Sequence, residues 1–345
     1  MRLVIITINY NGSENTIKLL KSLTEQTGTS THSIPQGSEF VESTSLRASQ
    51  DFQTIVVDNA SEEADFDNLK KGITMGTIAN AMVPMVIRNK DNLGFSGGNN
   101  MGIKKALDPS TSSSRPELGT KAGQENGSLL RQGFVGQADW VVLLNNDTWA
   151  EKDFIACLKP ILTKKQGIVG LPLNEGDQIA YCGKIQWFKS TLKHSYELPV
   201  TNYRLQKIYA IGGAVAIHKD VFDKIGLWDE KYFLYFEDAD FSLRAQKAGI
   251  PVTIVPDVMI HHNTSSTTKK LGSPLLLRYH YRNALYFNLK NGPWYIKSLV
   301  WPWSLIIVLK QILKVMIYHN QEQSLAILKG VFDFYRHKMG RILIV

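Results

Sequence analysis

The sequence predicts an α/β fold with a central, mostly parallel sheet flanked by helices. Four short runs of Val, Ile and Leu are apolar without alternation, at residues 3–8, 54–57, 85–87 and 140–144. Continuous apolar runs are typical of strands that are covered on both faces, as in a parallel sheet. Helical patterns lie between these runs, and an alternation of strand and helix with right-handed crossovers indicates an α/β fold.

Local patterns predict the helices and the later strands. Residues 15–23 carry Ile and Leu at helical spacing, and a second helical pattern at residues 99–107 follows a glycine-rich turn. Further along the chain we expect a strand at residues 211–217, a helix at 238–248 that ends at Gly249, and a last strand at 252–255.

Two polar segments interrupt this pattern, at residues 27–50 and 109–137. They are rich in Ser, Thr, Gly and Gln and have almost no apolar periodicity. We expect both to be solvent-exposed, mobile insertions, with a binding role as the less favoured alternative.

The composition excludes several classes of protein. Hydrophobic residues make up 43% and charged residues 20% of the 345 residues, as in a folded globular protein. Cys157 and Cys182 have no ligand-type spacing, so neither a disulfide framework nor a zinc–thiolate site is expected. The apolar run after Met1 and Arg2 is too short for a secretion signal, which favours a cytoplasmic catalytic part.

The C-terminal part of the sequence is basic. From residue 263 on, twelve Lys and Arg face only Glu322 and Asp333, a balance of +10, so the first 262 residues contribute −2 to the net charge of +8. Such a segment could meet nucleic acid, anionic lipid or an acidic substrate. The Trp-, Leu- and Ile-rich residues around it favour an anionic membrane surface as partner and speak against nucleic acid.

Residues 294–318 carry most of this apolar character. Lys297, Lys310 and Lys314 interrupt them, Pro302 should kink them, and no uncharged run reaches the roughly 18–20 residues of a spanning helix. The three lysines share one sector of a helical wheel with polar Ser304 and Gln311, as in a helix that lies in the membrane interface. The alternative is a helix packed on its own domain.

We therefore expect two parts of the chain. Residues 1–272 would form the catalytic domain, and residues 273–345 a helical, basic and aromatic region that associates with the membrane. The protein would then be peripheral to the inner face of the cell membrane.

Polar residues follow each of the first four strands, where ligands bind in open parallel sheets. They are residues 9–12 (Asn-Tyr-Asn-Gly), 58–61 (Asp-Asn-Ala-Ser), 89–94 (Asn-Lys-Asp-Asn-Leu-Gly) and 145–147 (Asn-Asn-Asp). Each group alone is an ordinary turn sequence. All four together predict a pocket that hydrogen-bonds a base and ribose and holds a metal beside a diphosphate.

The glycine-rich stretch at residues 92–102 belongs to this edge. GxGxxG after the first strand and a Walker A sequence are both absent. The stretch could instead let the backbone approach a sugar nucleotide closely.

Asp147 is the main candidate for a metal ligand. A hard divalent cation such as Mg²⁺ or Mn²⁺ can neutralise the charge that develops on a departing diphosphate. Asp147 ends a buried strand, and His262 could supply a second ligand, although adjacent histidines such as His261 and His262 are more often plain polar residues.

Asp238 is the candidate general base. Transfer of a group to a hydroxyl needs a base that takes the hydroxyl proton. The aromatic residues around Asp238 would exclude water and raise its pKa. Acidic residues in a first helical turn also complement the helix dipole, and this reading is equally good.

These residues together resemble a known family, the inverting family 2 glycosyltransferases of the GT-A fold, and within it the bacterial rhamnosyltransferase-like enzymes. The likeness covers about residues 1–290 without the two insertions. The motifs that carry it, in order, are residues 8–11, 56–61, 92–102, 144–147, 212–214, 226–230 and 236–240, followed by His262 with Ser265 and Ser266, and by residues 281–283.

The resemblance implies a role for each matching residue. Asp58 would bind the base or ribose with Asn9 and Tyr10 beside it, and Asn92 and Asn146 would complete the nucleotide site. Asp147 and His262 would hold the metal, and Asp238 would be the base. Gly213, Trp228, Asp229 and Glu237 would border the acceptor and sugar. Asn145 departs from the family pattern, because many relatives have Asp there, and this weakens the metal site by one carboxylate.

The resulting prediction is an inverting, metal-assisted glycosyltransferase. It would move a sugar from a UDP- or dTDP-sugar onto a hydroxyl group of a glycan or lipid-linked acceptor in polysaccharide biosynthesis. One alternative is a sugar-nucleotide nucleotidyltransferase, although the basic, glycine-rich signature of those enzymes is missing after the first strand. The other is a catalytically silent binding protein.

Overall fold

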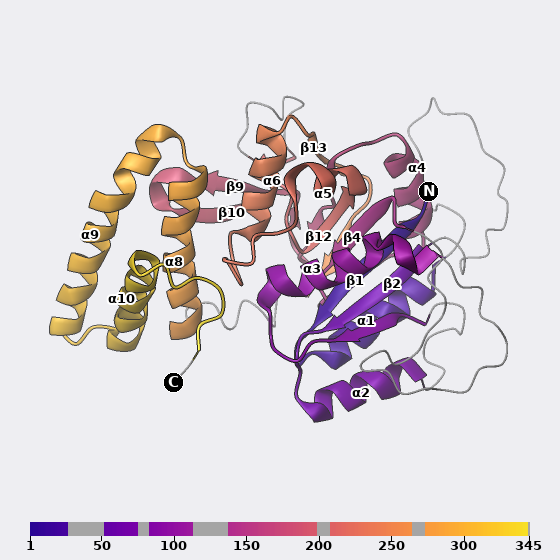
Figure 1. Ribbon diagram of the computed structural model, residues 1–345, viewed down its shortest axis with the longest axis horizontal. Helices are drawn as coiled ribbons and strands as arrows, with labels where there is room; N and C mark the ends of the chain where they lie inside the picture. The colour runs from indigo at the N-terminus through magenta and orange to yellow at the C-terminus, as the bar shows by residue number, and fades with distance from the viewer. Residues whose placement is uncertain (27–51, 75–82, 113–136, 199–207, 264–272, 344–345) are drawn as a thin grey trace.

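A seven-stranded sheet forms the centre of the molecule (Figure 1). The computed structural model describes residues 1–26, 52–74, 83–112, 137–198, 208–263 and 273–343. The strands are β1 (Leu3–Asn9), β2 (Phe52–Asp58), β3 (Met85–Arg88), β4 (Trp140–Leu144), β6 (Ile168–Gly170), β12 (Ala214–His218) and β13 (Val252–Ile254). They lie in the order β13-β6-β12-β4-β1-β2-β3, and only β12 runs antiparallel to its neighbours in this sheet. The predicted, mostly parallel sheet is confirmed.

Helices cover both faces of the sheet. Helices α1 (Ser13–Thr24), α2 (Glu63–Thr74) and α4 (Phe154–Thr163) lie on one face, and α3 (Gly94–Leu107), α5 (Lys219–Ile225) and α6 (Glu237–Lys247) on the other. The alternation of side chains along each strand divides the core in two. Ile5 of β1 packs in the cluster with α1 and α4, whereas Ile6 packs in the cluster with α3 and α6.

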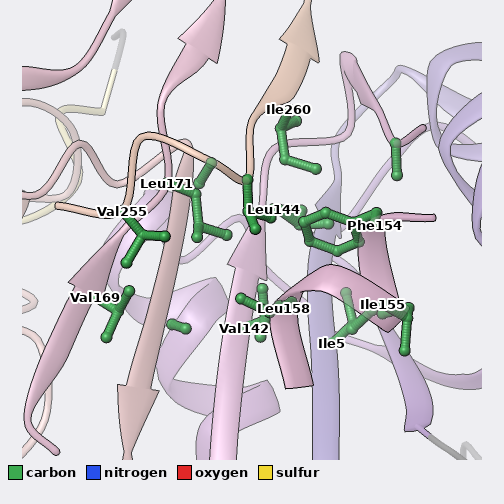
Figure 2. Close-up of a cluster of buried hydrophobic side chains, with 14 of the residues drawn as sticks. Ile5, Val142, Leu144, Phe154, Ile155, Leu158, Val169, Leu171, Val255 and Ile260 are labelled. Carbon is green, nitrogen blue, oxygen red and sulfur yellow. The ribbon is translucent and has the colours of Figure 1, made fainter. Parts of the chain in front are cut away.

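The core under α4 shows how tightly this sheet is covered. Figure 2 shows Phe154 and Leu158 of α4 next to Leu144 and Val142 of the central strand β4, and Ile155 next to Ile5 of β1. Burying each such side chain contributes about 1.5–3 kcal/mol to folding. This packing fixes the position of the carboxyl end of β4, where the polar residues 145–147 follow.

Helix α3 begins five residues earlier than predicted, at Gly94. Its glycines serve packing: a Cβ on Gly102 would lie 2.5 Å from Ile6, and one on Gly94 would lie 2.3 Å from the carbonyl oxygen of Phe233. The φ of Gly94 is +73°, a conformation that favours glycine. The glycine-rich stretch is thus mostly a helix held close to the sheet.

Two small sheets and two 3₁₀ helices were not predicted. One sheet has the order β5 (Thr148–Trp149), β14 (Ile260–His262), β7 (Leu173–Asn174), β8 (Ile179–Ala180), and the other β10 (Thr191–Ser195), β9 (Cys182–Gln186), β11 (Ile208–Tyr209). The 3₁₀ helices are η3 (Pro109–Ser112) and η4 (Trp187–Lys189). In the first sheet His262 pairs with Thr148, which brings the second predicted metal ligand next to Asp147.

The predicted insertions fall almost entirely outside the described residues. Residues 27–51 and 113–136 are not described, nor are Ser265 and Ser266. At the start of the second segment, residues 109–112 form the short helix η3.

Three helices follow the sheet domain: α8 (Pro274–Asn291), α9 (Trp294–Met316) and α10 (Gln321–Tyr335). In Figure 1 they form a stack at one side of the molecule, and the C-terminal segment runs back along α8. Ser273 caps α8 by accepting a hydrogen bond from the backbone of Leu276. Gly330 allows α10 to approach α8 closely, because a Cβ there would lie 2.5 Å from the carbonyl oxygen of Arg278.

Helix α9 turns its apolar side outward. It is helical through Pro302, and its polar residues Ser304 and Gln311 are buried, whereas Leu305 and Leu309 are each 58% exposed. Ser304 and Gln311 belong to the polar sector that was predicted to face water, but the structure turns both of them toward the protein. With 23 residues and a mean hydropathy of 1.5 over an 18-residue window, α9 is long and apolar enough to cross a membrane by length and composition, although its lysines argued against this in the sequence.

Candidate active site

A cavity of about 590 Å³ opens at the carboxyl edge of the central sheet. Its wall includes Tyr10 after β1, Asn59 after β2, Asn92 after β3 and residues 145–147 after β4. Gly212, which precedes β12, lies in the same wall. Four strand ends that are far apart in the sequence therefore meet at one site.

Asn9 and Asp58 lie beneath this cavity. Both side chains are fully buried, and neither lines the cavity wall. The amide of Asn9 donates to Asp58 at 2.9 Å and to Asp65 at 2.9 Å, and Arg88 forms an ion pair with Asp58 at 3.4 Å. These contacts hold the ends of β1 and β2 together, and direct contact of Asp58 with a nucleotide stays a prediction.

Asn59 was not among the predicted site residues, although it is part of the Asp-Asn-Ala-Ser motif. Its amide nitrogen donates to Asn92 Oδ1 and to the carbonyl oxygen of Gly94, both at 3.0 Å. Its oxygen accepts from Asn89 and from the backbone of Leu93, also at 3.0 Å. One buried amide thus fixes the whole turn after β3, including Asn92 at the cavity wall.

Asn146 closes the cavity on the side of α1. Its amide donates to Thr16 Oγ1 at 3.2 Å and to the carbonyl oxygen of Gly12 at 3.3 Å. Because Thr16 also donates to Asn9, the ends of β1 and β4 share one hydrogen-bond network.

Asp147 and His262 form an ion pair at the cavity. Nε2 of His262 lies 3.4 Å from Oδ1 of Asp147, and Nδ1 lies 3.5 Å from Oε1 of Glu175. Burial alone would lower the pKa of His262, but the carboxylates of Asp147 and Glu175 raise it to about 9. A metal that binds His262 at neutral pH must therefore displace a proton.

Glu175 is a functional candidate that the sequence did not reveal. Its Oε1 also lies 3.2 Å from Nδ1 of His194. Hydrogen bonds from His194 and His262 lower the pKa of Glu175 to about 2, so it stays ionised. A carboxylate behind a histidine orients that histidine toward a metal.

The donor set fits a divalent cation that is shared with a substrate. In the described part of the chain, no group of three or more His, Cys, Asp and Glu could hold a metal by itself. Asp147 in the cavity wall and His262 in contact with it could supply one oxygen and one nitrogen. Mg²⁺ and Mn²⁺ are commonly bound by one or two protein ligands, with substrate phosphates and water completing the coordination.

Asp238 lies behind Gly212, which is part of the cavity wall. Its Oδ2 accepts a hydrogen bond from the backbone of Gly212 at 3.2 Å, and its Oδ1 accepts one from Ala239 at 2.8 Å. Burial raises the pKa of Asp238, although these two backbone donors oppose the shift. Burial and the charge of Asp238 raise the pKa of its neighbour Glu237 well above the usual range.

The segment that leads into Asp238 is strained. Phe233, Tyr235 and Phe236 all have positive φ values, between 61° and 75°, which is unfavourable for bulky residues. Fully buried Asn283 of α8 holds this segment, because its amide donates to the carbonyl oxygens of Tyr232 and Leu234, both at 2.7 Å. Strain of this kind persists only where surrounding contacts enforce it.

Asn283→Ala should destabilise the protein. Buried carbonyls of the strained segment would lose their donor, at about 1–3 kcal/mol for each unsatisfied group. We expect the free energy of unfolding to fall by about 2–4 kcal/mol in a urea titration. Asn68→Ala removes a single hydrogen bond from an exposed residue and is the matched control. Equal stability of the two variants would show that Asn283 does not enforce the strain.

Comparison with known proteins decides the family. Residues 86–276, more than half of the chain, match the model described as "Glycosyltransferase like family 2". The chain belongs to this family. The family predicted from the sequence motifs is thereby confirmed.

Two curated relatives of this family 2 chain are rhamnosyl transferases. It is 24% identical over 170 residues to dTDP-rhamnosyl transferase RfbF of Shigella flexneri. This alignment covers 47% of this chain and 57% of the relative. It is 27% identical over 90 residues to N-acetylglucosaminyl-diphospho-decaprenol L-rhamnosyltransferase of Mycobacterium tuberculosis. This second alignment covers 26% of this chain and 29% of the relative. The chain thus spans about half, or less, of the length of these relatives.

Solved structures share the fold. S. aureus TarS 1-349 in complex with UDP-GlcNAc aligns with 100% of this chain and 95% of its own, at a TM-score of 0.51 and 12% identity. The mannosyltransferase PcManGT from Pyrobaculum calidifontis, in complex with GDP-Man and Mn²⁺, aligns with 98% of this chain and 88% of its own, at 0.50 and 12%. The predicted GT-A fold is confirmed.

Three of the residues predicted to border the acceptor lie away from the cavity wall. Trp228 is buried, stacks on Phe241 at 5.2 Å and lies under Gly212. Asp229 forms an ion pair with Lys290 of α8 at 2.7 Å. Gly213 accepts a hydrogen bond from the backbone of Asn145 at 2.9 Å. None of these three lines the cavity, and their contact with an acceptor stays a prediction.

The C-terminal segment contributes a wall that the sequence did not predict. Tyr279 of α8 and Arg341, Ile342 and Leu343 line the cavity together. The backbone of Ile342 donates to the hydroxyl oxygen of Tyr279 at 2.7 Å. Arg341 lies 3.7 Å from Asp91, in the turn after β3.

Proposed function

We propose that this protein is a metal-assisted, inverting glycosyltransferase. It would transfer a sugar from a UDP- or dTDP-sugar to a hydroxyl group of a glycan or lipid-linked acceptor in polysaccharide biosynthesis. The observation that carries the proposal is the single cavity at the carboxyl edge of the sheet. Asp147 lies in its wall, and Asp238 is attached to that wall through Gly212.

Asp238 acts as the general base. The acceptor hydroxyl gives its proton to the carboxylate, and its oxygen forms a bond to the anomeric carbon of the donor. The bond from that carbon to the diphosphate breaks on the opposite side, and its electron pair leaves with the nucleoside diphosphate. The raised pKa of Asp238 makes it a stronger base than an exposed carboxylate.

Asp147 and His262 would hold the metal, with Glu175 orienting His262. The bound cation supplies charge neutralisation for the leaving diphosphate. Tyr10, Asn92 and Asn146 would hold the nucleotide in the same cavity. The name of the dTDP-rhamnosyl transferase relative supports a dTDP-sugar as donor.

The function can be tested without knowing the acceptor. The full chain is incubated with UDP- and dTDP-sugars, with and without Mn²⁺, and released nucleoside diphosphate is measured. We expect slow, metal-dependent hydrolysis of at least one donor, because water can replace the acceptor. Release of diphosphate from a nucleoside triphosphate instead would identify a nucleotidyltransferase, and no turnover of any donor would contradict the proposal.

We also propose that residues 273–345 attach a catalytic domain of residues 1–272 to the inner face of the cell membrane. Large apolar side chains are exposed along α9, and Lys297 and Lys310 are exposed on the same helix. Lysine next to exposed Leu and Trp matches a surface of anionic lipid. One of the relatives is named for a decaprenol-linked substrate, which supports a membrane-bound acceptor.

Polar substitutions on α9 should release the protein from membranes. Leu305, Leu309 and Leu313 are 58–59% exposed and follow one another at four-residue spacing, so they lie on one side of α9. The triple Leu→Ser variant should bind phosphatidylglycerol vesicles at least about tenfold more weakly, because each Leu loses its burial in lipid. Leu198→Ser, on the catalytic domain, is the control. Unchanged co-sedimentation of the triple variant would refute the membrane assignment.

A further inference from the structure

A second cavity, of about 700 Å³, lies between α8, α10 and the C-terminal segment. Five Lys and Arg side chains line it, and Asp333 is the only carboxylate among its described lining residues. The five cationic residues are Arg278, Arg282, Lys329, Lys338 and Arg341.

Most of this positive charge is not neutralised. Asp333 already binds Arg278 at 2.6 Å. The buried guanidinium of Arg282 donates to neutral oxygens, among them the carbonyl of Lys338 at 3.2 Å. Lys329 and Lys338 are exposed and form no ion pair with any residue that the structure describes. A cavity lined by one sign of charge concentrates the field and attracts anions.

This second, basic cavity adjoins the cavity at the carboxyl edge of the sheet, which is called the donor cavity below because we propose that the donor binds there. Arg341, Ile342 and Leu343 line both, so the C-terminal segment is the wall between them. This wall is held in place, because the backbone of Gly340 donates to the carbonyl oxygen of Lys231 at 2.8 Å. An anion bound in the basic cavity would therefore lie next to the cavity in which we propose that the donor binds.

The basic cavity also adjoins an apolar surface. On α10, Leu325, Lys329 and Phe332 are spaced by four and three residues and lie on one side of the helix. Leu325 is 45% and Phe332 54% exposed. A cation between two exposed apolar side chains suits a ligand that is both anionic and lipidic.

We propose that the basic cavity binds the diphosphate of a membrane-embedded acceptor, a lipid-linked sugar diphosphate. Its sugar would reach the donor cavity past Arg341, and its lipid chain would follow the exposed side of α10. This inference rests on the proposed function and names the acceptor class. A phospholipid headgroup also carries a phosphate that this cavity could bind. The position of the cavity beside the donor cavity favours the acceptor, because an acceptor must lie next to the donor in order to react.

Binding of farnesyl diphosphate to the full chain tests the proposal. The double variant Lys329→Gln/Lys338→Gln should bind it at least about tenfold more weakly, because each lysine offers a charge-assisted contact to phosphate. The double variant Lys164→Gln/Lys224→Gln removes the same charge from exposed sites of the catalytic domain and should bind within about twofold of the native chain. Melting temperatures of all three proteins confirm that they are folded.

Three outcomes would overturn the proposal. Equal affinity of the two double variants for farnesyl diphosphate would show that the cavity does not bind it. A loss confined to phosphatidylglycerol vesicles would assign the cavity to lipid headgroups. An equal loss of affinity for UDP would assign it to the donor. Because these assays measure binding alone, their failure would leave metal-dependent donor hydrolysis, and so the proposed function, intact.

Discussion

Asp238→Asn is expected to abolish most sugar transfer while leaving the donor bound. The amide cannot take the acceptor proton, and loss of a general base lowers the rate by about 10²–10⁴-fold. Gly212 would still find an oxygen acceptor on the new side chain, so the wall of the cavity should keep its form. Turnover is measured with a membrane fraction as the source of acceptor, and donor binding by calorimetry.

The control for this variant is Asp257→Asn, which changes an exposed carboxylate of the same domain. It should keep native turnover and native donor affinity. Transfer by Asp238→Asn at a rate close to that of Asp257→Asn would remove Asp238 from the mechanism.

Asp147→Asn should weaken metal binding and donor turnover together. The substitution removes the carboxylate that faces His262 at 3.4 Å and leaves the metal one neutral amide oxygen. Because a bound cation contributes several kcal/mol to stabilising the leaving group, we expect metal-dependent donor hydrolysis to fall at least about 100-fold. Mn²⁺ affinity is measured by titration calorimetry on the same protein.

Asp177→Asn, at an exposed position, is the matched control for Asp147→Asn. It should retain native Mn²⁺ affinity. If Asp147→Asn bound Mn²⁺ as tightly as this control, Asp147 would not be a metal ligand.

The central strands could be predicted because each is a local signal. β1, β2 and β4 are apolar runs that are buried on both faces, whereas β3, at the edge of the sheet, is mostly half-buried. The small sheets carry no such signal, since strands such as β5 and β7 have two residues each and are joined into one sheet by pairing with distant β14. This distant pairing is also what places His262 beside Asp147.

Helix α8 was predicted only as part of the helical region at residues 273–345, and its own bounds were not, because its centre is polar. Arg282 and Asn283 are buried and hold the strained segment before Asp238, so they break the apolar periodicity that predicts a helix. Buried polar residues also misled the prediction for α9. Ser304 and Gln311 were assigned to the side that faces water, but they face the protein.

The strand-end residues of the candidate site could also be predicted, but their layering could not. Tyr10, Asn92 and Asp147 reach the cavity wall, whereas Asn9 and Asp58 lie beneath it. Sequence spacing places a residue at a strand end, but the hydrogen bonds of its neighbours decide whether it faces a ligand. The wall formed by Arg341 depends on a contact between the C-terminal segment and the turn after β3, and it has no local signal.

Electron–nuclear double resonance on Mn²⁺ bound to the full chain together with UDP or dTDP tests the central claim most directly. The account predicts that one and the same ion shows phosphorus coupling from the diphosphate and nitrogen coupling from His262, and that the nitrogen coupling disappears in His262→Ala. A bound ion that shows no phosphorus coupling at saturating nucleotide would contradict a shared donor and metal site.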